Sequence, residues 1–199
     1  MKKRKKRIFF RTNYRESWNY LNESKKFIYA IIVVFFLSFI FGFFVPTPDA
    51  VAEKIFEIIN ELIEETEGMS QTGLISFIFL NNLQSSFFGM IFGFFFGIFP
   101  MISAIFNGYL IGFVASLATK TEGFFVLWRL FPHGIFELPA IFISLGLGLR
   151  ISTFIFQKDK IGSLKKYSFD SLKVFLFIVV PLLIIAAIVE GSLIFLFDN

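Results

Sequence analysis

The sequence contains no cysteine and only one histidine, His133. Without cysteine it offers no disulfide, thiol nucleophile, iron–sulfur cluster or thiolate zinc site. One histidine excludes any two-histidine metal site within a single chain, including the HExxH type. Charged residues are also scarce, at 17% of the 199 positions. We therefore expect no cofactor, no metal site and no catalytic residue.

Apolar residues are abundant instead: they make up 56% of the chain, and phenylalanine alone occupies 33 positions. A soluble domain of this composition would have too little polar surface to cover itself. Several apolar runs approach or exceed the roughly 20 residues that a helix needs to cross a bilayer. The composition predicts one all-α membrane domain over 1–199, a polytopic helical bundle.

Prolines and apolar runs define about five expected transmembrane helices. These are 27–45, 74–99, 101–118, 133–155 and 174–197. The first follows a long basic flank and is expected to be a signal anchor rather than a cleaved signal peptide. The apolar region 124–156 is too long for one untilted helix. We expect it to break at Pro132, after a short interfacial or re-entrant helix over 124–131.

The segment 47–68 has the pattern of an amphipathic helix outside the hydrocarbon. Apolar residues recur on one face at helical spacing, namely Val51, Ile55, Ile58, Ile59 and Leu62. The other face is acidic and carries Asp49, Glu53, Glu57, Glu61, Glu64, Glu65 and Glu67. Such a helix either lies solvated on the outer leaflet or forms a docking surface for a protein partner or for cations.

Basic residues concentrate in the arm 1–26 and in 157–173, which we expect to be a loop. The positive-inside rule places both in the cytoplasm, and five spans then place the C-terminus outside the cell membrane. Aromatic residues share one face of the arm, which favours an interfacial helix drawn to anionic lipid rather than to nucleic acid. Charge that only sets topology is the alternative. The expected headgroup-binding residues are Lys2, Lys3, Arg4, Lys5, Lys6, Arg7, Arg11 and Arg15.

Small residues recur every four positions on three of the expected spans, which is the pattern of close helix packing in lipid. The ridges comprise Gly89, Gly93 and Gly97; Ala104, Gly108, Gly112 and Ser116; and Ala140, Ser144, Gly148 and Ser152. We expect them to pack helices within the chain, and one ridge to form in addition a homo-oligomer interface.

Polar groups at membrane depth form a further candidate site. They are Asn81, Asn82, His133, Glu137 and Glu190 in the outer half of the membrane, and Asn107 nearer the inner side. Ionisable groups in a span are costly and usually face the protein interior or a watery cavity. We interpret them as a hydrogen-bonded cluster that clamps the second, fourth and fifth spans. A conduction or substrate path, a catalytic carboxylate pair and a His/Glu metal site are the alternatives.

Four stretches, in order, resemble the stage II sporulation protein M family: FLNNLQSSFFGMIFGFFFG, NGYLIG, PHGIFELPAIFISLGLGLR and LLIIAAIVEG. The resemblance covers roughly 75–192, and HGxxExPA is its most specific motif. It implies a multi-spanning helical protein that, in sporulating bacteria, anchors a complex with two peptidoglycan-degrading partners and is not itself the hydrolase. Relatives also occur in organisms that do not sporulate, including archaea. The matching positions are Asn82, Gly93, Asn107, Gly108, His133, Gly134, Glu137, Pro139, Ala140 and Glu190.

These patterns favour a non-enzymatic scaffold or membrane-remodelling component that assembles a complex. The alternative is a small permease or channel subunit with a polar path in the outer half of the membrane. An intramembrane protease would have to use His133, and no serine lies in a nucleophile motif. The expected partners are membrane lipids, further copies of the chain, and extracellular or cytoplasmic proteins. The bias toward Phe, Ile, Lys and Glu is typical of a thermophile.

Overall fold

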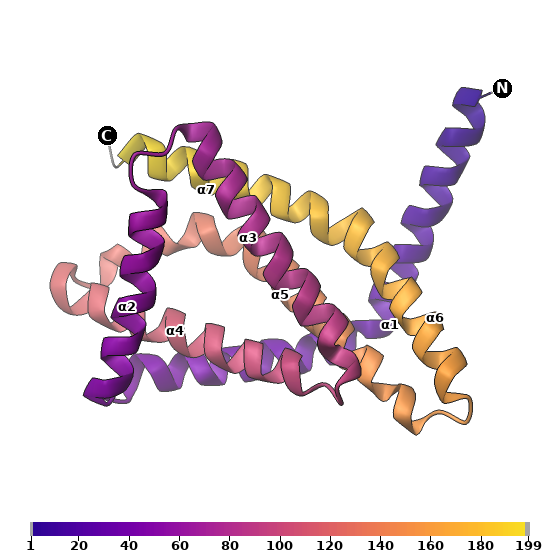
Figure 1. The fold of residues 1–199 in the computed structure, drawn as a ribbon, viewed down its shortest axis with the longest axis horizontal. Coiled ribbons are helices and arrows are strands. Elements are labelled where there is room, and N and C mark those ends of the chain that lie inside the picture. The colour runs from indigo at the N-terminus through magenta and orange to yellow at the C-terminus, as the bar shows by residue number, and fades with distance from the viewer. Residues whose placement is uncertain (1, 198–199) are drawn as a thin grey trace.

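The computed structural model describes the backbone of residues 2–197, and the side chains of these residues except 2–9, 128–133 and 197. Within this part of the chain every element is helical, which confirms the all-α prediction (Figure 1). The α-helices are α1 (Lys2–Phe44), α2 (Asp49–Thr66), α3 (Gln71–Ile91), α4 (Ile98–Glu122), α5 (Phe131–Ser152), α6 (Lys160–Val174) and α7 (Val180–Phe197). The shorter elements are η1 (Phe92–Phe94), η2 (Phe124–Leu130), η3 (Thr153–Phe156) and the π-helical η4 (Phe175–Val179).

Five helical segments of the described chain are long and apolar enough to cross a membrane, as the sequence predicts. They are Phe10–Phe44, Gln71–Phe94, Ile98–Glu122, Gly134–Phe156 and Lys160–Leu196. Helix α2 and the short helix η2 lie outside this set, and η2 closely matches the short helix expected over 124–131.

Helix α1 joins the basic arm and the first span without a break. No proline or glycine occurs in it before Gly42, so nothing in the sequence interrupts its backbone hydrogen bonds. Figure 1 shows the N-terminal part of α1 leaving the bundle at an angle to the rest. The arm and the span, expected as separate elements, are therefore one helix.

The turn between the second and third spans lies earlier than expected. Phe96 and Gly97 have positive φ angles of 57° and 73°, the left-handed conformation that ends a helix, and α4 begins at Ile98. Pro100 falls in the first turn of α4, where its missing N–H is not needed. The expected boundary at Pro100 is therefore wrong, because a proline this close to a helix start fits inside the helix.

The segment expected as a loop over 157–173 is mostly helical. Asp159 caps α6 by accepting a hydrogen bond of 2.9 Å from the Gly162 backbone N–H. Helix α6 then continues through η4 into α7. The wider π turn ends at Val179, two residues before Pro181, whose ring cannot follow a regular α-helical turn without a clash. The basic segment and the fifth span thus form one helix.

Helix α5 lies at the centre of the packing. It contacts α1 and α4 on one side and α3 and α7 on the other. Two apolar clusters result, one around Leu147 and Leu183, the other around Phe35 and Leu145. Because α5 contributes to both clusters, it joins the α1–α4 pair to the α3–α7 pair.

Most of the small-residue ridges lie at these helix contacts. A Cβ at Gly93 would overlap the carbonyl of Gly148, and a Cβ at Gly89 would meet the side chain of Leu145, so α3 approaches α5 backbone to backbone. A Cβ at Gly108 would overlap the carbonyl of Phe35, and one at Gly112 that of Phe39, on α1. Gly97 faces Leu149 and Ser152 of α5, while Ala104, Ala140 and Ser144 are fully buried. These close approaches are the packing mode expected of small residues in lipid.

We expect Gly93→Ala to lower the free energy of unfolding by about 1–3 kcal/mol, because the added methyl group meets backbone atoms that cannot rotate away. Thermal unfolding of the purified protein measures the effect. Gly134→Ala is the matched control, since a Cβ there comes no closer than 3.4 Å to Leu138. Equal stability of the two variants would contradict the tight crossing of α3 and α5.

Candidate functional site

Buried carboxyl groups occur at one end of the bundle. Glu137 is the one charged side chain that is buried among those described, with 5% of its surface exposed, and its Oε2 is shielded completely. Glu190 is half-buried, and its Oε2 is also shielded. At least one oxygen of each carboxyl group is therefore shielded from the surroundings of the chain, as expected for an ionisable group in a span.

The elements that carry these carboxyl groups pack against one another. Glu137 lies on α5 and Glu190 on α7, and both helices contact α3. The residue after Glu190, Gly191, lies so close to Ile75 of α3 that a Cβ would come within 2.8 Å of its side chain. Near the same end, the side chain of Gln71 on α3 donates a 3.1 Å hydrogen bond to Ser192.

The His133 backbone belongs to α5, but its side chain lies outside the described side chains. The clamp itself stays a prediction.

Two predicted members of this cluster point elsewhere. Asn81 is exposed, whereas Asn82 is half-buried, because neighbours on a helix point about 100° apart and cannot both face inward. Asn107 lies on α4 and donates to the carbonyl oxygen of Ser103 at 2.8 Å, one turn earlier in the same helix. Of the two asparagines expected within reach of Glu137, Asn82 is therefore the one turned toward the bundle, and its contact with Glu137 stays a prediction.

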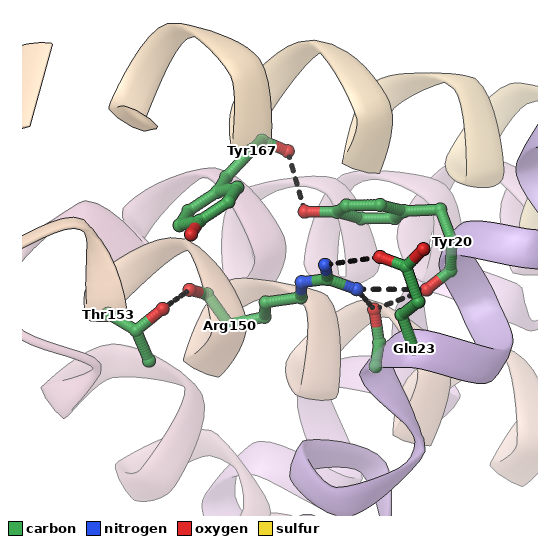
Figure 2. Close-up of polar contacts among 6 residues, drawn as sticks. Tyr20, Glu23, Arg150, Thr153 and Tyr167 are labelled. Carbon is green, nitrogen blue, oxygen red and sulfur yellow. Dashed lines mark hydrogen bonds and ion pairs between the residues drawn. The ribbon is translucent and has the colours of Figure 1, made fainter. Parts of the chain in front are cut away.

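A polar clamp that the sequence analysis missed lies at the other end of α5. Arg150 donates through Nη1 to the Tyr20 carbonyl at 3.0 Å and to Ser24 Oγ at 2.8 Å. Its Nη2 is 2.8 Å from Oε2 of Glu23, and its guanidinium lies over the Tyr20 ring at 3.8 Å from the centroid (Figure 2). This combination of cation–π contact and charge-assisted hydrogen bonds fastens α5 to α1.

Helix α6 closes the clamp from a third side. The Tyr20 hydroxyl donates to the Tyr167 carbonyl at 3.3 Å, and the Tyr167 ring stands 5.7 Å from the Arg150 guanidinium (Figure 2). A second ion pair, Lys173 to Glu16 at 2.8 Å, also joins α6 to α1. The signal in the sequence was an arginine next to an apolar run, with two acidic residues, Glu16 and Glu23, inside a basic arm.

Helix α2 crosses the end of the bundle opposite α6 (Figure 1). It is held by Ile55, which is buried, and by Phe56, whose ring packs edge-on against Phe113 of α4 at 5.9 Å. Just before α2, the Thr47 hydroxyl hydrogen-bonds the Tyr109 hydroxyl at 2.9 Å. The apolar stripe is wider than this contact, since Ile58, Leu62 and other apolar residues stay exposed.

The acidic face of α2 is open to the surroundings. The side chains of Glu53, Glu57, Glu61, Glu64 and Glu65 are all exposed. Lys54 forms a 2.5 Å ion pair with Glu57, whose hydrogen bond and charge raise the pKa of the lysine. Lys54 is therefore the one basic side chain on α2 against a row of carboxylates, and the exposed face of this helix is strongly negative.

Two cavities lie near the end of the bundle that α2 crosses. The larger, of about 610 Å³, lies between α1, α2, α4, η2 and α5 and is lined by apolar side chains and Gly134. A second cavity, of about 380 Å³, lies between the end of α1 and α4. Neither is lined by Glu137 or Glu190. Among the described residues no group of three or more His, Asp or Glu side chains could hold a metal ion.

We expect Arg150→Gln to lower the free energy of unfolding by about 2–4 kcal/mol, because it removes charge-assisted hydrogen bonds and a cation–π contact together. The change in thermal unfolding of the purified protein measures this loss. Glu23→Gln should cost less than about 1 kcal/mol, since its side chain is 64% exposed and its ion pair is solvated. A clamp of this kind is excluded if Arg150→Gln is as stable as the parent protein.

Comparison with known proteins gives one finding. A family model described as stage II sporulation protein M matches residues 31–193, which includes all four stretches that carry the resemblance in the sequence. No curated protein and no solved structure matches the chain.

Proposed function

Because the chain belongs to the stage II sporulation protein M family, we propose that it acts as a non-enzymatic scaffold or remodelling component that assembles a protein complex at the membrane. Its helices are those of a multi-pass membrane protein. The observation that carries the proposal is α2, an acidic helix fixed across the end of the bundle by Ile55 and Phe56. A rigid row of carboxylates at the membrane surface suits recognition of a basic protein segment.

The opposite end of the molecule carries the complementary charge. Arg11 and Arg15 are exposed on α1, and lysines are exposed on or beside α6, namely Lys158, Lys160, Lys165 and Lys166. The side chains of Lys2–Arg7 lie outside the described side chains. Under the proposal this basic end contacts anionic headgroups of the cytoplasmic leaflet, so that the N-terminus is cytoplasmic and α2 and the C-terminus are outside.

A small permease or channel subunit is the second candidate, favoured by the shielded carboxyl oxygens of Glu137 and Glu190 within spans. A path for ions or polar solutes requires a cavity lined by such groups. Neither of the two cavities at that end of the bundle is lined by Glu137 or Glu190, and the larger one is almost wholly apolar. A scaffold needs no such cavity, so we rank it first.

We expect the combined change of Glu53, Glu57, Glu61 and Glu64 to Gln to weaken capture of the partner from native membranes roughly tenfold, since each exposed charge contributes a few tenths of a kcal/mol. Quantitative affinity purification at low and high salt measures the effect. The matched control changes the same four residues to Asp and keeps the charge. Undiminished capture by the Gln variant would contradict a docking role for α2.

Flux measurements in proteoliposomes separate the two candidate functions. A scaffold predicts ion and solute leakage equal to that of empty vesicles, both for the parent protein and for Glu137→Gln. A selective flux that is present in the parent and lost in Glu137→Gln would favour the permease and overturn the scaffold. Thermal unfolding of both proteins controls for misfolding.

A further inference from the structure

Helix α3 exposes polar side chains in the middle of a span. Asn81, Gln84 and Ser85 are exposed, and the apolar segment around them runs from Gln71 to Phe94. With a rise of about 1.5 Å per residue, these side chains lie about 15–21 Å from the start of the span. That distance is close to half of a bilayer core about 30 Å thick. Two amides and a hydroxyl would therefore face hydrocarbon near the membrane centre.

The three polar residues occupy one face of α3. They follow the i, i+3, i+4 spacing of helix neighbours, and Phe88, exposed to 49%, continues the same face by one turn. Ser86 and Met90, on the opposite side of α3, are buried in the bundle. The polar face thus lies opposite the side of α3 that Ser86 and Met90 bury in the bundle.

The side chains of Asn81, Gln84 and Ser85 make no hydrogen bond within the described part of the chain. Lipid tails offer neither donors nor acceptors. An amide left without a partner in hydrocarbon costs several kcal/mol. The face needs a hydrogen-bonding partner that lies in the membrane at the same depth.

We propose that this partner is a second copy of the chain, bound through Asn81, Gln84 and Ser85 of α3 in a two-fold homodimer. Both copies insert in the same orientation, so the two-fold axis runs along the membrane normal and places each residue opposite its own counterpart at equal depth. Asn and Gln amides carry both donors and acceptors. Two identical faces therefore satisfy each other, whereas a partner of another sequence would need polar groups at matching positions.

This interface differs from the one that the glycine pattern suggests. Gly89 of α3 and Gly93 of η1 are in contact with Leu145 and Gly148 of α5, so that ridge is occupied within the chain. Dimerisation through the polar face leaves the α3–α5 crossing unchanged. Leu80 and Phe88, both about half exposed, flank the amides and supply apolar packing around the hydrogen bonds.

Site-directed cross-linking in proteoliposomes tests the proposal, because a chain without cysteine accepts single thiols cleanly. Ser85→Cys, a nearly isosteric change, should give a covalent dimer on mild oxidation. The control is Ile184→Cys, exposed on α7 and also inside the membrane, about 12 Å from Ser192, whose hydrogen bond with Gln71 places the ends of α3 and α7 side by side. A dimer at position 85 and none at 184 supports the proposal. Equal yields at both positions, or none at either, overturn it.

The strength of the contact gives a second readout. Changing Asn81 and Gln84 together to Leu should weaken self-association about 3- to 30-fold, the range for interhelical hydrogen bonds in membranes. Energy transfer between labelled copies at increasing lipid dilution measures the dissociation constant, and Phe88→Leu is the control that keeps the amides. Unchanged association of the double variant overturns the proposal. So does a thiol at position 85 that cross-links only to a different protein in native membranes and not to itself in purified vesicles.

Discussion

Helix α5 contacts α1, α3, α4, α6 and α7, and where it crosses α3 and η1 the backbones of Gly93 and Gly148 meet without intervening side chains. In lipid, burial of apolar surface does not drive helices together, so association depends on close packing and hydrogen bonds. The crossing brings α3 and α5 near enough for Met90 and Leu147 to fill one core. On its other side α5 packs Phe142 against Phe35 of α1. Both helix groups therefore depend on α5.

The polar side chains fall into two groups according to what surrounds them. At one end of α5 the Arg150 guanidinium finds oxygen acceptors and an aromatic face on α1. At the other end Glu137 is enclosed among apolar helices. Charge at the molecular surface is also divided, with basic residues on α1 and α6 and acidic residues on α2. A protein organised in this way offers each membrane face a different kind of contact, which is why assembly rather than chemistry is the function we favour.

Hydrophobic length predicted the five spans, the helical periodicity of apolar residues predicted the acidic helix, and glycine spacing predicted residues at the close crossings. Contacts between distant residues were not predictable in the same way. Nothing local to Arg150 shows that Tyr20 lies over it, because the two are brought together only by the packing of α1 on α5. The turn at Phe96 and Gly97 was missed because Pro100 is the stronger local signal, although a helix tolerates proline in its first turn. The helical character of 160–174 was hidden by its charge, which resembles that of a loop.

The unbroken run from α6 through η4 to α7 has a mechanical consequence. Its candidate span, Lys160–Leu196, is 37 residues long, which corresponds to about 55 Å of helix, far more than the hydrocarbon thickness. Such a helix is long enough to reach both aqueous faces, so a tilt of α6 at the basic end would displace the segment that carries Glu190 unless the helix bends at the π turn before Pro181. How much of a tilt at the basic end reaches the opposite end of the helix then depends on the stiffness of that turn.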